Sequence, residues 1–141
     1  MPKFKAVANH APRVINYVQN GAAGAAIDAY IFTNPTGSGN YYEVVEAVEI
    51  HDALGTDAGA VTADVKIVPS GTTLASGTTV LDSTFNLKAT ADTLVNRTLH
   101  ATNSRLVKPG DSLAVDLTGV MTAVAGLCIQ VTLRPTRIAN V

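Results

Sequence analysis

Apolar and polar residues alternate with a period of two along much of this chain, which is the pattern of strands that bury one face. The alternation is clearest in three segments: Ala60–Pro69, Asp111–Thr118 and Leu127–Arg134. Shorter strands are predicted in five further segments: Lys3–Ala8, Arg13–Gln19, Asp28–Thr33, Ser83–Lys88 and Thr93–Ala101. Within Arg13–Gln19, strand geometry places Val14, Asn16 and Val18 on one face and Ile15 and Tyr17 on the other.

The segment Tyr41–His51 (YYEVVEAVEIH) is compatible with two periods. Helical spacing collects Tyr41, Val44, Val45 and Val48 on one face. Strand alternation collects Tyr42, Val44, Val48 and Ile50, but it places Glu46 on that same apolar face. The tyrosines and the β-branched residues favour a strand.

Glycine and proline separate these segments. Asn34–Asn40 and Leu54–Gly59 are predicted turns, and Ser70–Thr79 is a predicted polar loop. In Lys108–Asp111, Pro109 and Gly110 match positions i+1 and i+2 of a type II turn, with Lys108 as a solvated flank. An anion-binding loop would open a helix, whereas strand alternation follows here, so no phosphate site is predicted.

The order of elements predicts an all-β fold: an antiparallel β-sandwich or jelly-roll-like single domain. Eight or nine short strands occur without βαβ alternation, and 141 residues are enough for one core that buries roughly two-thirds of the unfolded chain's surface. We expect residues 1–27 to form a partly extended N-terminal arm, because this segment is too short for a core of its own. Residues 28–141 form the predicted β-sandwich domain.

Composition favours a protein that associates with others. Charged residues make up 15% of the chain, against about 25% in an ordinary domain, and low charge is typical of surfaces that partner subunits cover. A compact monomer with a Thr-, Ala- and Ser-rich exterior is the alternative. The net charge is −1 and the basic residues are scattered, so no direct nucleic-acid binding is predicted. The sequence contains neither an apolar run of membrane-spanning length nor a secretion signal. The single cysteine, Cys128, fits synthesis in a reducing cytoplasm.

The sequence predicts no enzyme, no metal site and no cofactor. The three histidines, His10, His51 and His100, lack the spacing of zinc ligands and are predicted on the surface or at strand edges. His51 and Asp52 are neighbours on a strand and point to opposite faces, so they form a poor dyad. Cys128 is predicted to be buried and unreactive.

The acidic residues point to no chemistry either. Glu43, Glu46 and Glu49 do not converge as a pair of acid–base carboxylates. Asp57, with Asp52 near it, supplies too few oxygens for a calcium site, so Leu54–Gly59 is interpreted as a plain glycine turn. These residues therefore favour a binding or structural module.

Five ordered segments resemble a known family. They are Tyr42–His51 (YEVVEAVEIH), Gly55–Thr62 (GTDAGAVT), Val65-Lys66, Ser83–Leu87 (STFNL) and Leu113–Gly119 (LAVDLTG). Together they resemble the capsid decoration, or cement, proteins of tailed bacteriophages. The resemblance spans roughly residues 28–135 and does not include the arm.

The resemblance implies a β-sandwich or jelly-roll module, often trimeric, that binds the outside of the mature phage head. It implies synthesis in the host bacterial cytoplasm, the major capsid protein as the partner, and stabilisation of the shell by bridging neighbouring subunits. We expect the arm to make contacts with the capsid or between protomers through six residues: Lys3, Phe4, Val7, Arg13, Val14 and Tyr17.

Two other classes stay open. One is a different virion part, such as a head-fibre base or a tail protein. The other is a module that binds a host glycan or receptor, which predicts a cleft with exposed Tyr and Asn or Asp groups. The absence of Trp and the presence of only four Tyr weaken this second class.

Overall fold

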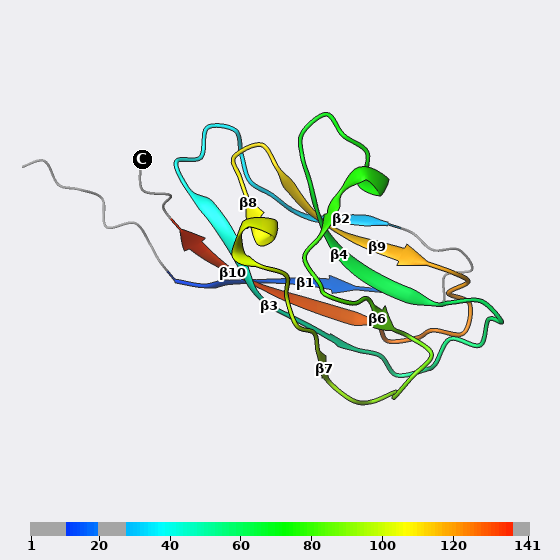
Figure 1. Ribbon diagram of the computed structural model, residues 1–141. Helices are drawn as coiled ribbons and strands as arrows, with labels where there is room; N and C mark the ends of the chain where they lie inside the picture. Colours follow the sequence, from blue (N-terminus) through cyan, green and yellow to red (C-terminus); the bar gives the residue numbers. More distant parts are fainter. Residues whose placement is uncertain (1–10, 20–27, 137–141) are drawn as a thin grey trace, which may run out of the picture.

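The computed structural model describes residues 11–19 and 28–136, which form two packed antiparallel sheets (Figure 1). Sheet A contains β1 (Arg13–Val18), β10 (Cys128–Thr136), β3 (Tyr41–Ile50), β7 (Val95–Asn96) and β8 (Leu106–Val107). Sheet B contains β2 (Ala29–Thr33), β9 (Ser112–Thr118), β4 (Thr62–Val68), β5 (Thr78–Thr79) and β6 (Phe85–Asn86). Two short 3-10 helices, η1 (Leu74–Ser76) and η2 (Thr102–Arg105), lie in the loops.

The strand order is that of a jelly roll. Sheet A runs β1-β10-β3-β7, with β8 also pairing with β3, and sheet B runs β2-β9-β4-β5, with β6 also pairing with β4. The chain passes from one sheet to the other between β1 and β2, β2 and β3, β3 and β4, β6 and β7, β8 and β9, and β9 and β10. This alternation closes two sheets over one core, and it confirms the predicted all-β sandwich.

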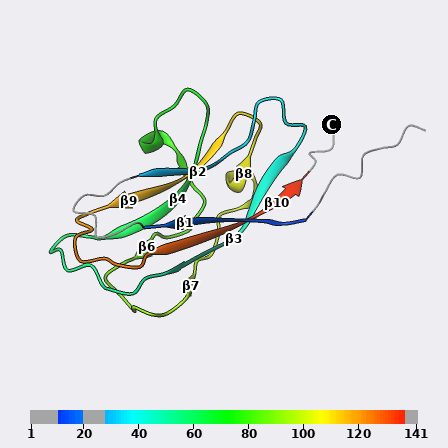
Figure 2. The same cartoon turned by 180° about the vertical axis from the view of Figure 1, so that it is seen from behind.

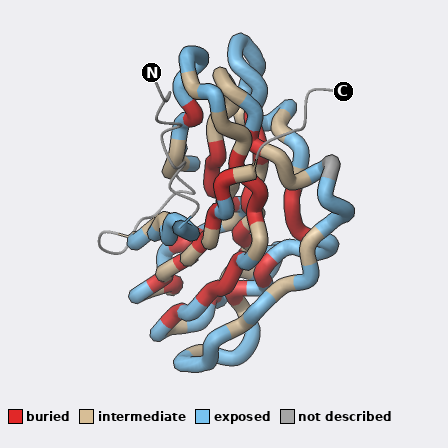
Figure 3. Tube along the Cα trace, turned by 90° about the vertical axis from the view of Figure 1, so that its left-hand side faces the viewer, coloured by how far each residue is buried: buried red, intermediate tan, exposed pale blue. Residues whose placement is uncertain are grey.

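The core lies between the sheets and is built by the predicted alternation. On β9 the side chains of Leu113, Val115 and Leu117 face inward and are buried, and on β10 Ile129, Val131 and Leu133 do the same. Buried segments gather along the middle of the sandwich, whereas the loops at both ends are exposed (Figure 3). The strands that carry a regular apolar face therefore form the centre of each sheet.

A β-bulge explains the ambiguous pattern of β3. Leu133 pairs with Val44 but Thr132 pairs with Glu46, so Val45 is an extra residue on β3. The extra residue exchanges the two faces of the strand beyond it. The predicted strand is confirmed, but its predicted apolar face is wrong after Val45: Glu46 and Ile50 face outward, and Glu49 lies on the buried side.

Other predictions are confirmed in part. β1, β2, β4 and β9 fall inside their predicted segments, while β10 continues through Pro135 to Thr136. The predicted strands Ser83–Lys88 and Thr93–Ala101 are wrong over most of their length, because only Phe85–Asn86 and Val95–Asn96 pair with a neighbour. The predicted strand Lys3–Ala8 lies outside the described residues. Neither helix in the described ranges is long or apolar enough to cross a membrane.

The predicted turn at Lys108–Asp111 is confirmed. The amide of Asp111 donates to the carbonyl of Lys108 at 2.9 Å, and Gly110 has a φ of 92°. A positive φ at position i+2 is what a type II turn requires of its glycine. The turn leads directly into β9, and Lys108 is exposed to solvent.

Candidate interaction surface

The segment expected as an arm contributes an edge strand to the sandwich. β1 pairs with β10 through all six of its residues, from Arg13 opposite Leu133 to Val18 opposite Cys128 (Figures 1 and 2). On its other side β1 pairs with no strand of the described chain. An unpaired edge leaves backbone donors and acceptors available to another chain.

The residues expected to make contacts are divided between the two faces of β1. Val14 points outward and is more than half exposed, together with Val18. Arg13 and Tyr17 lie on the other side: the Arg13 guanidinium is 5.3 Å from the centre of the Tyr42 ring, and Tyr17 packs half-buried against the core. Burial raises the pKa of Tyr17, and the negative charge of Asp28 adds to this effect. Lys3, Phe4 and Val7 lie outside the described residues.

An apolar row crosses the outer face of sheet A. Val18 pairs with Cys128, and Cys128 pairs with Ile50, so these side chains lie beside one another on three strands. Val95 pairs with Glu49 in an antiparallel register, so Leu94, one residue earlier, lies opposite Ile50. Leu94 therefore extends the row beyond Ile50. Val18, Ile50 and Leu94 are all exposed large apolar residues. The alternation in Arg13–Gln19 placed Val18 on the same face as Val14, as observed. The exposure of Ile50, in contrast, depends on the bulge in β3.

Charged groups lie elsewhere on this face, at exposed Glu46 in the middle of β3 and around Glu43 near its start. The Glu43 carboxylate is nearly buried and accepts from two arginines, Arg134 at 2.6 Å and Arg105 at 3.0 Å. Sheet B carries an ion pair in the middle of its outer face, where Lys66 Nζ is 2.5 Å from Asp116 Oδ2. The apolar row on sheet A contains no charged side chain, so a partner that covers it desolvates no charge within the row.

A buried ion pair was not predicted. His51 is fully buried, and its Nδ1 lies 2.5 Å from Oε1 of Glu49, which is 1% exposed. Burial raises the pKa of Glu49, while the hydrogen bond and charge of His51 and the charge of Arg97 oppose that rise. The prediction that His51 lies on the surface is wrong, because the bulge turns Glu49 and His51 inward. His100 is exposed as predicted, and His10 lies outside the described residues.

This pair has no access to a substrate, since both side chains are enclosed in the core. Within the described ranges, no three His, Cys, Asp or Glu side chains are grouped so that they could hold a metal ion. Cys128 is half-buried on the outer face, not fully buried as predicted.

A comparison with solved structures finds a chain with a similar fold. A chain described as "Capsid of Ralstonia phage GP4" superposes with a TM-score of 0.61, covers 99% of this chain and 91% of its own length, and is 20% identical. The two chains share one fold. No protein-family model matches the sequence, and no curated protein matches it.

Proposed function

We propose that this protein is a structural component of a phage virion: a decoration, or cement, protein on the outer surface of the mature head. It bridges neighbouring subunits of the major capsid protein and so stabilises the shell. The observation that carries the proposal is the shared fold over nearly the whole chain with a chain of a phage capsid. The resemblance of Tyr42–His51 and Leu113–Gly119 to cement proteins supports the finer assignment.

The exposed surface is suited to this role. The row formed by Val18, Cys128, Ile50 and Leu94 offers apolar area without charge, and the free edge of β1 offers backbone hydrogen bonds. Residues Arg13, Val14 and Tyr17 on β1, with Lys3, Phe4 and Val7 before it, are proposed to contact the capsid or a second protomer. Many copies on one particle multiply a modest affinity, so no single interface has to be large.

A homotrimer is the proposed assembly. A trimer presents one patch three times, which matches the three-fold and quasi-three-fold positions of a shell where three capsomers meet. The measurement is the mass of the purified protein by light scattering. A monomeric mass at every concentration would contradict the trimer, although it would leave the head-binding experiment unaffected.

The central experiment mixes purified protein with expanded heads that lack decoration and, separately, with precursor heads. We expect binding to the expanded form, which co-sedimentation with the heads would detect. Absence of binding to both forms would refute the cement role. Counting copies per virion by quantitative mass spectrometry separates a decoration protein from a head-fibre base or tail protein, which has few copies.

Matched variants test which surface binds. Val18→Asp and Ile50→Asp introduce charge into the apolar row and are expected to weaken head binding at least about tenfold, because a buried unpaired carboxylate costs more than 1.4 kcal/mol. Thr84→Asp, at an exposed position before β6, is the control. Deletion of residues 2–10 tests Lys3, Phe4 and Val7 while leaving β1 intact. Deletion as far as Gln19 would also remove the core contacts of Ile15 and Tyr17.

A further inference from the structure

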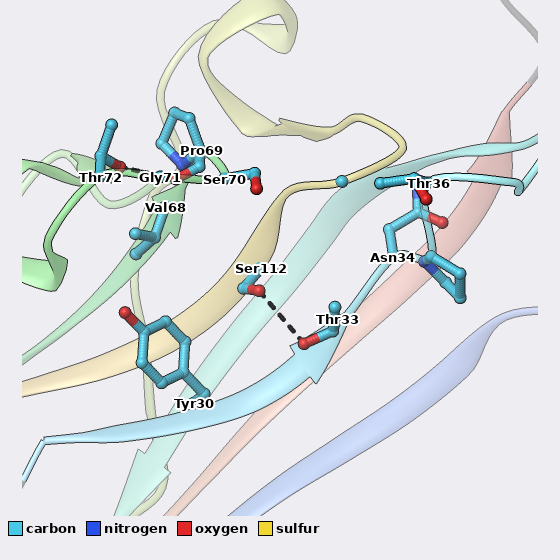
Figure 4. A pocket seen from close by; sticks show the side chains of 12 residues that line it. Tyr30, Thr33, Asn34, Thr36, Val68, Pro69, Ser70, Gly71, Thr72 and Ser112 are labelled. Carbon is cyan, nitrogen blue, oxygen red and sulfur yellow. Dashed lines mark hydrogen bonds between the residues drawn. The ribbon is translucent and has the colours of Figure 1, made fainter.

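A pocket of about 360 Å³ lies at one end of sheet B, beside exposed residues of β2 (Figure 4), and none of its lining residues belongs to the apolar row of sheet A. Three structural elements surround it: the end of β2 with the loop that follows, the turn after β4, and the Lys108–Asp111 turn with the start of β9. Its volume lies within the range of small-molecule sites. The proposed head-binding surface does not include this pocket.

The lining is uncharged and rich in hydroxyl groups. None of the 12 residues that line it carries a charged side chain, and six bear hydroxyls: Tyr30, Thr33, Thr36, Ser70, Thr72 and Ser112. A charged ligand would find no counter-charge in such a lining. A neutral ligand with many hydroxyls would find both donors and acceptors, because each hydroxyl offers one donor and two acceptor sites.

Three of these hydroxyls are available for hydrogen bonds to a ligand, while the other three already take part in internal ones. Thr33 Oγ1 and Ser112 Oγ share one hydrogen bond of 3.1 Å, and Thr72 Oγ1 donates to the carbonyl of Pro69 at 2.7 Å. The hydroxyls of Tyr30, Thr36 and Ser70 make no hydrogen bond within the described ranges of the chain. A ligand would therefore gain these hydrogen bonds without breaking internal ones.

Tyr30 supplies an aromatic face. Its side chain is 58% exposed and lies beside Ser112 and Thr33, across from the turn at Pro69–Thr72 (Figure 4). An exposed tyrosine has an apolar ring and a polar tip, so it can pack against C–H groups of a ligand while its hydroxyl bonds to oxygen. A sugar ring has an apolar C–H face and hydroxyls around its edge, which is the complementary arrangement.

The pocket is also pre-organised. Asn34 is fully buried behind it and links the surrounding segments. Its backbone amide donates to the carbonyl of Asp111 at 2.9 Å and its carbonyl accepts from Gly110 at 2.7 Å. Its side-chain amide donates to the carbonyls of Asn40 at 3.0 Å and Val107 at 3.1 Å. A rigid wall lowers the entropy cost of binding a ligand.

We propose that this pocket binds a neutral saccharide unit, with Tyr30 as the stacking platform and the hydroxyls of Thr36 and Ser70 as hydrogen-bonding groups. One small, solvent-exposed site of this kind binds a sugar weakly, with a dissociation constant of roughly 1 mM. Many copies on one particle would convert weak single-site binding into firm attachment to a glycan-coated surface. This inference depends on the pocket alone and not on the head-binding surface.

The test is an NMR titration of the full chain with a panel of probes: neutral hexoses, a deoxyhexose and N-acetylhexosamine, with glucuronic acid and glucosamine as charged counterparts. We expect the neutral probes to shift amide signals of residues 30–36, 69–72 and 110–112. Tyr30→Ala should weaken binding about tenfold, and Tyr30→Phe should weaken it only a few-fold, because the ring is kept. Thr84→Ala, at an exposed position before β6 and outside the pocket, should leave the affinity unchanged.

Three results would overturn the proposal. The first is the absence of signal shifts with every neutral probe at concentrations of about 20 mM, well above the expected dissociation constant. The second is equal binding of the charged counterparts. The third is loss of head binding in Tyr30→Ala without any saccharide binding by the native protein, which would assign the pocket to a protein partner. Retained head binding in Tyr30→Ala, together with lost saccharide binding, would support both functions separately.

Discussion

The buried Glu49–His51 pair gives a sharp test of how this core is held together. One hydrogen bond joins the two side chains: Nδ1 of His51 lies 2.5 Å from Oε1 of Glu49, and neither side chain reaches solvent. Nε2 of His51 is buried without a hydrogen-bond partner among the described residues. Replacing only one of the two side chains leaves a buried polar or charged group without its partner. Breaking a buried pair in this way costs about 3–5 kcal/mol, whereas replacing both groups by apolar side chains is often close to neutral.

We therefore expect His51→Leu and Glu49→Leu each to lower the free energy of unfolding by about 3 kcal/mol or more. For a chain of this size, that lowers the Tm by roughly 10 °C. The double variant Glu49→Leu/His51→Leu should recover most of the loss. Arg97 loses its electrostatic interaction with Glu49 in Glu49→Leu and in the double variant. Its side chain is half-buried, with the guanidinium 5.9 Å from the centre of the Phe85 ring and Nε without a hydrogen-bond partner among the described residues, so part of the loss remains in the double variant.

Urea denaturation of the native protein and the three variants measures this coupling as a double-mutant cycle. A coupling energy of about 2 kcal/mol or more is expected. Single variants that each cost less than about 1 kcal/mol would refute the inference that the two groups depend on each other. A double variant no more stable than the sum of the single losses would refute it as well.

The pH dependence has a definite sign. Burial raises the pKa of Glu49 above 4.5, so the folded protein holds this proton more tightly than the unfolded chain. The stabilisation from protonation is complete below pH 4.5 and is lost as the pH rises through the folded-state pKa. Relative to Glu49→Gln, which cannot titrate there, the native protein should lose stability as the pH rises above 4.5. Parallel stability curves for the two proteins would contradict this reasoning.

Three further outcomes are expected. Gly119→Ala should lower the free energy of unfolding, measured by urea denaturation, by more than about 3 kcal/mol, because Gly119 has a φ of 95° and an added Cβ would clash with the carbonyl oxygen of Ala60. Gly39→Ala, where an added Cβ would meet nothing within 4 Å, should be nearly neutral. Equal losses in the two variants would disprove the steric cause. Glu43→Gln should cost about 1–2 kcal/mol, since it removes the charge that holds Arg105 and Arg134, whereas Glu46→Gln at an exposed position should cost about 0.5 kcal/mol or less. Cys128, half-buried on the outer face of sheet A, should react with a maleimide in the free folded protein and should be protected from it on decorated heads. Mass spectrometry measures the labelling. Equal labelling of the free and the head-bound protein would show that Cys128 is not part of the contact surface.

The sequence by itself determined the strands whose alternation is regular. Ser112–Thr118 and Cys128–Thr136 carry apolar side chains at every second position, and each such strand has to bury that face whatever its neighbours are. The Lys108–Asp111 turn is equally local, because the ring of Pro109 restricts its own φ and Gly110 adopts the positive φ of 92° without a steric cost. These elements were predicted with nearly correct bounds.

The tertiary structure decided which residues face outward on β3 and which edges are left open. One extra residue, Val45, moves Glu49 and His51 into the core and Ile50 to the surface, and only the pairing with β10 shows where that residue is inserted. Short strands such as Phe85–Asn86 exist because a neighbour pairs with them, since their own sequence fixes neither length nor register. The saccharide pocket likewise joins Tyr30, Ser70 and Gly110, which the sequence separates and the jelly-roll connections bring together.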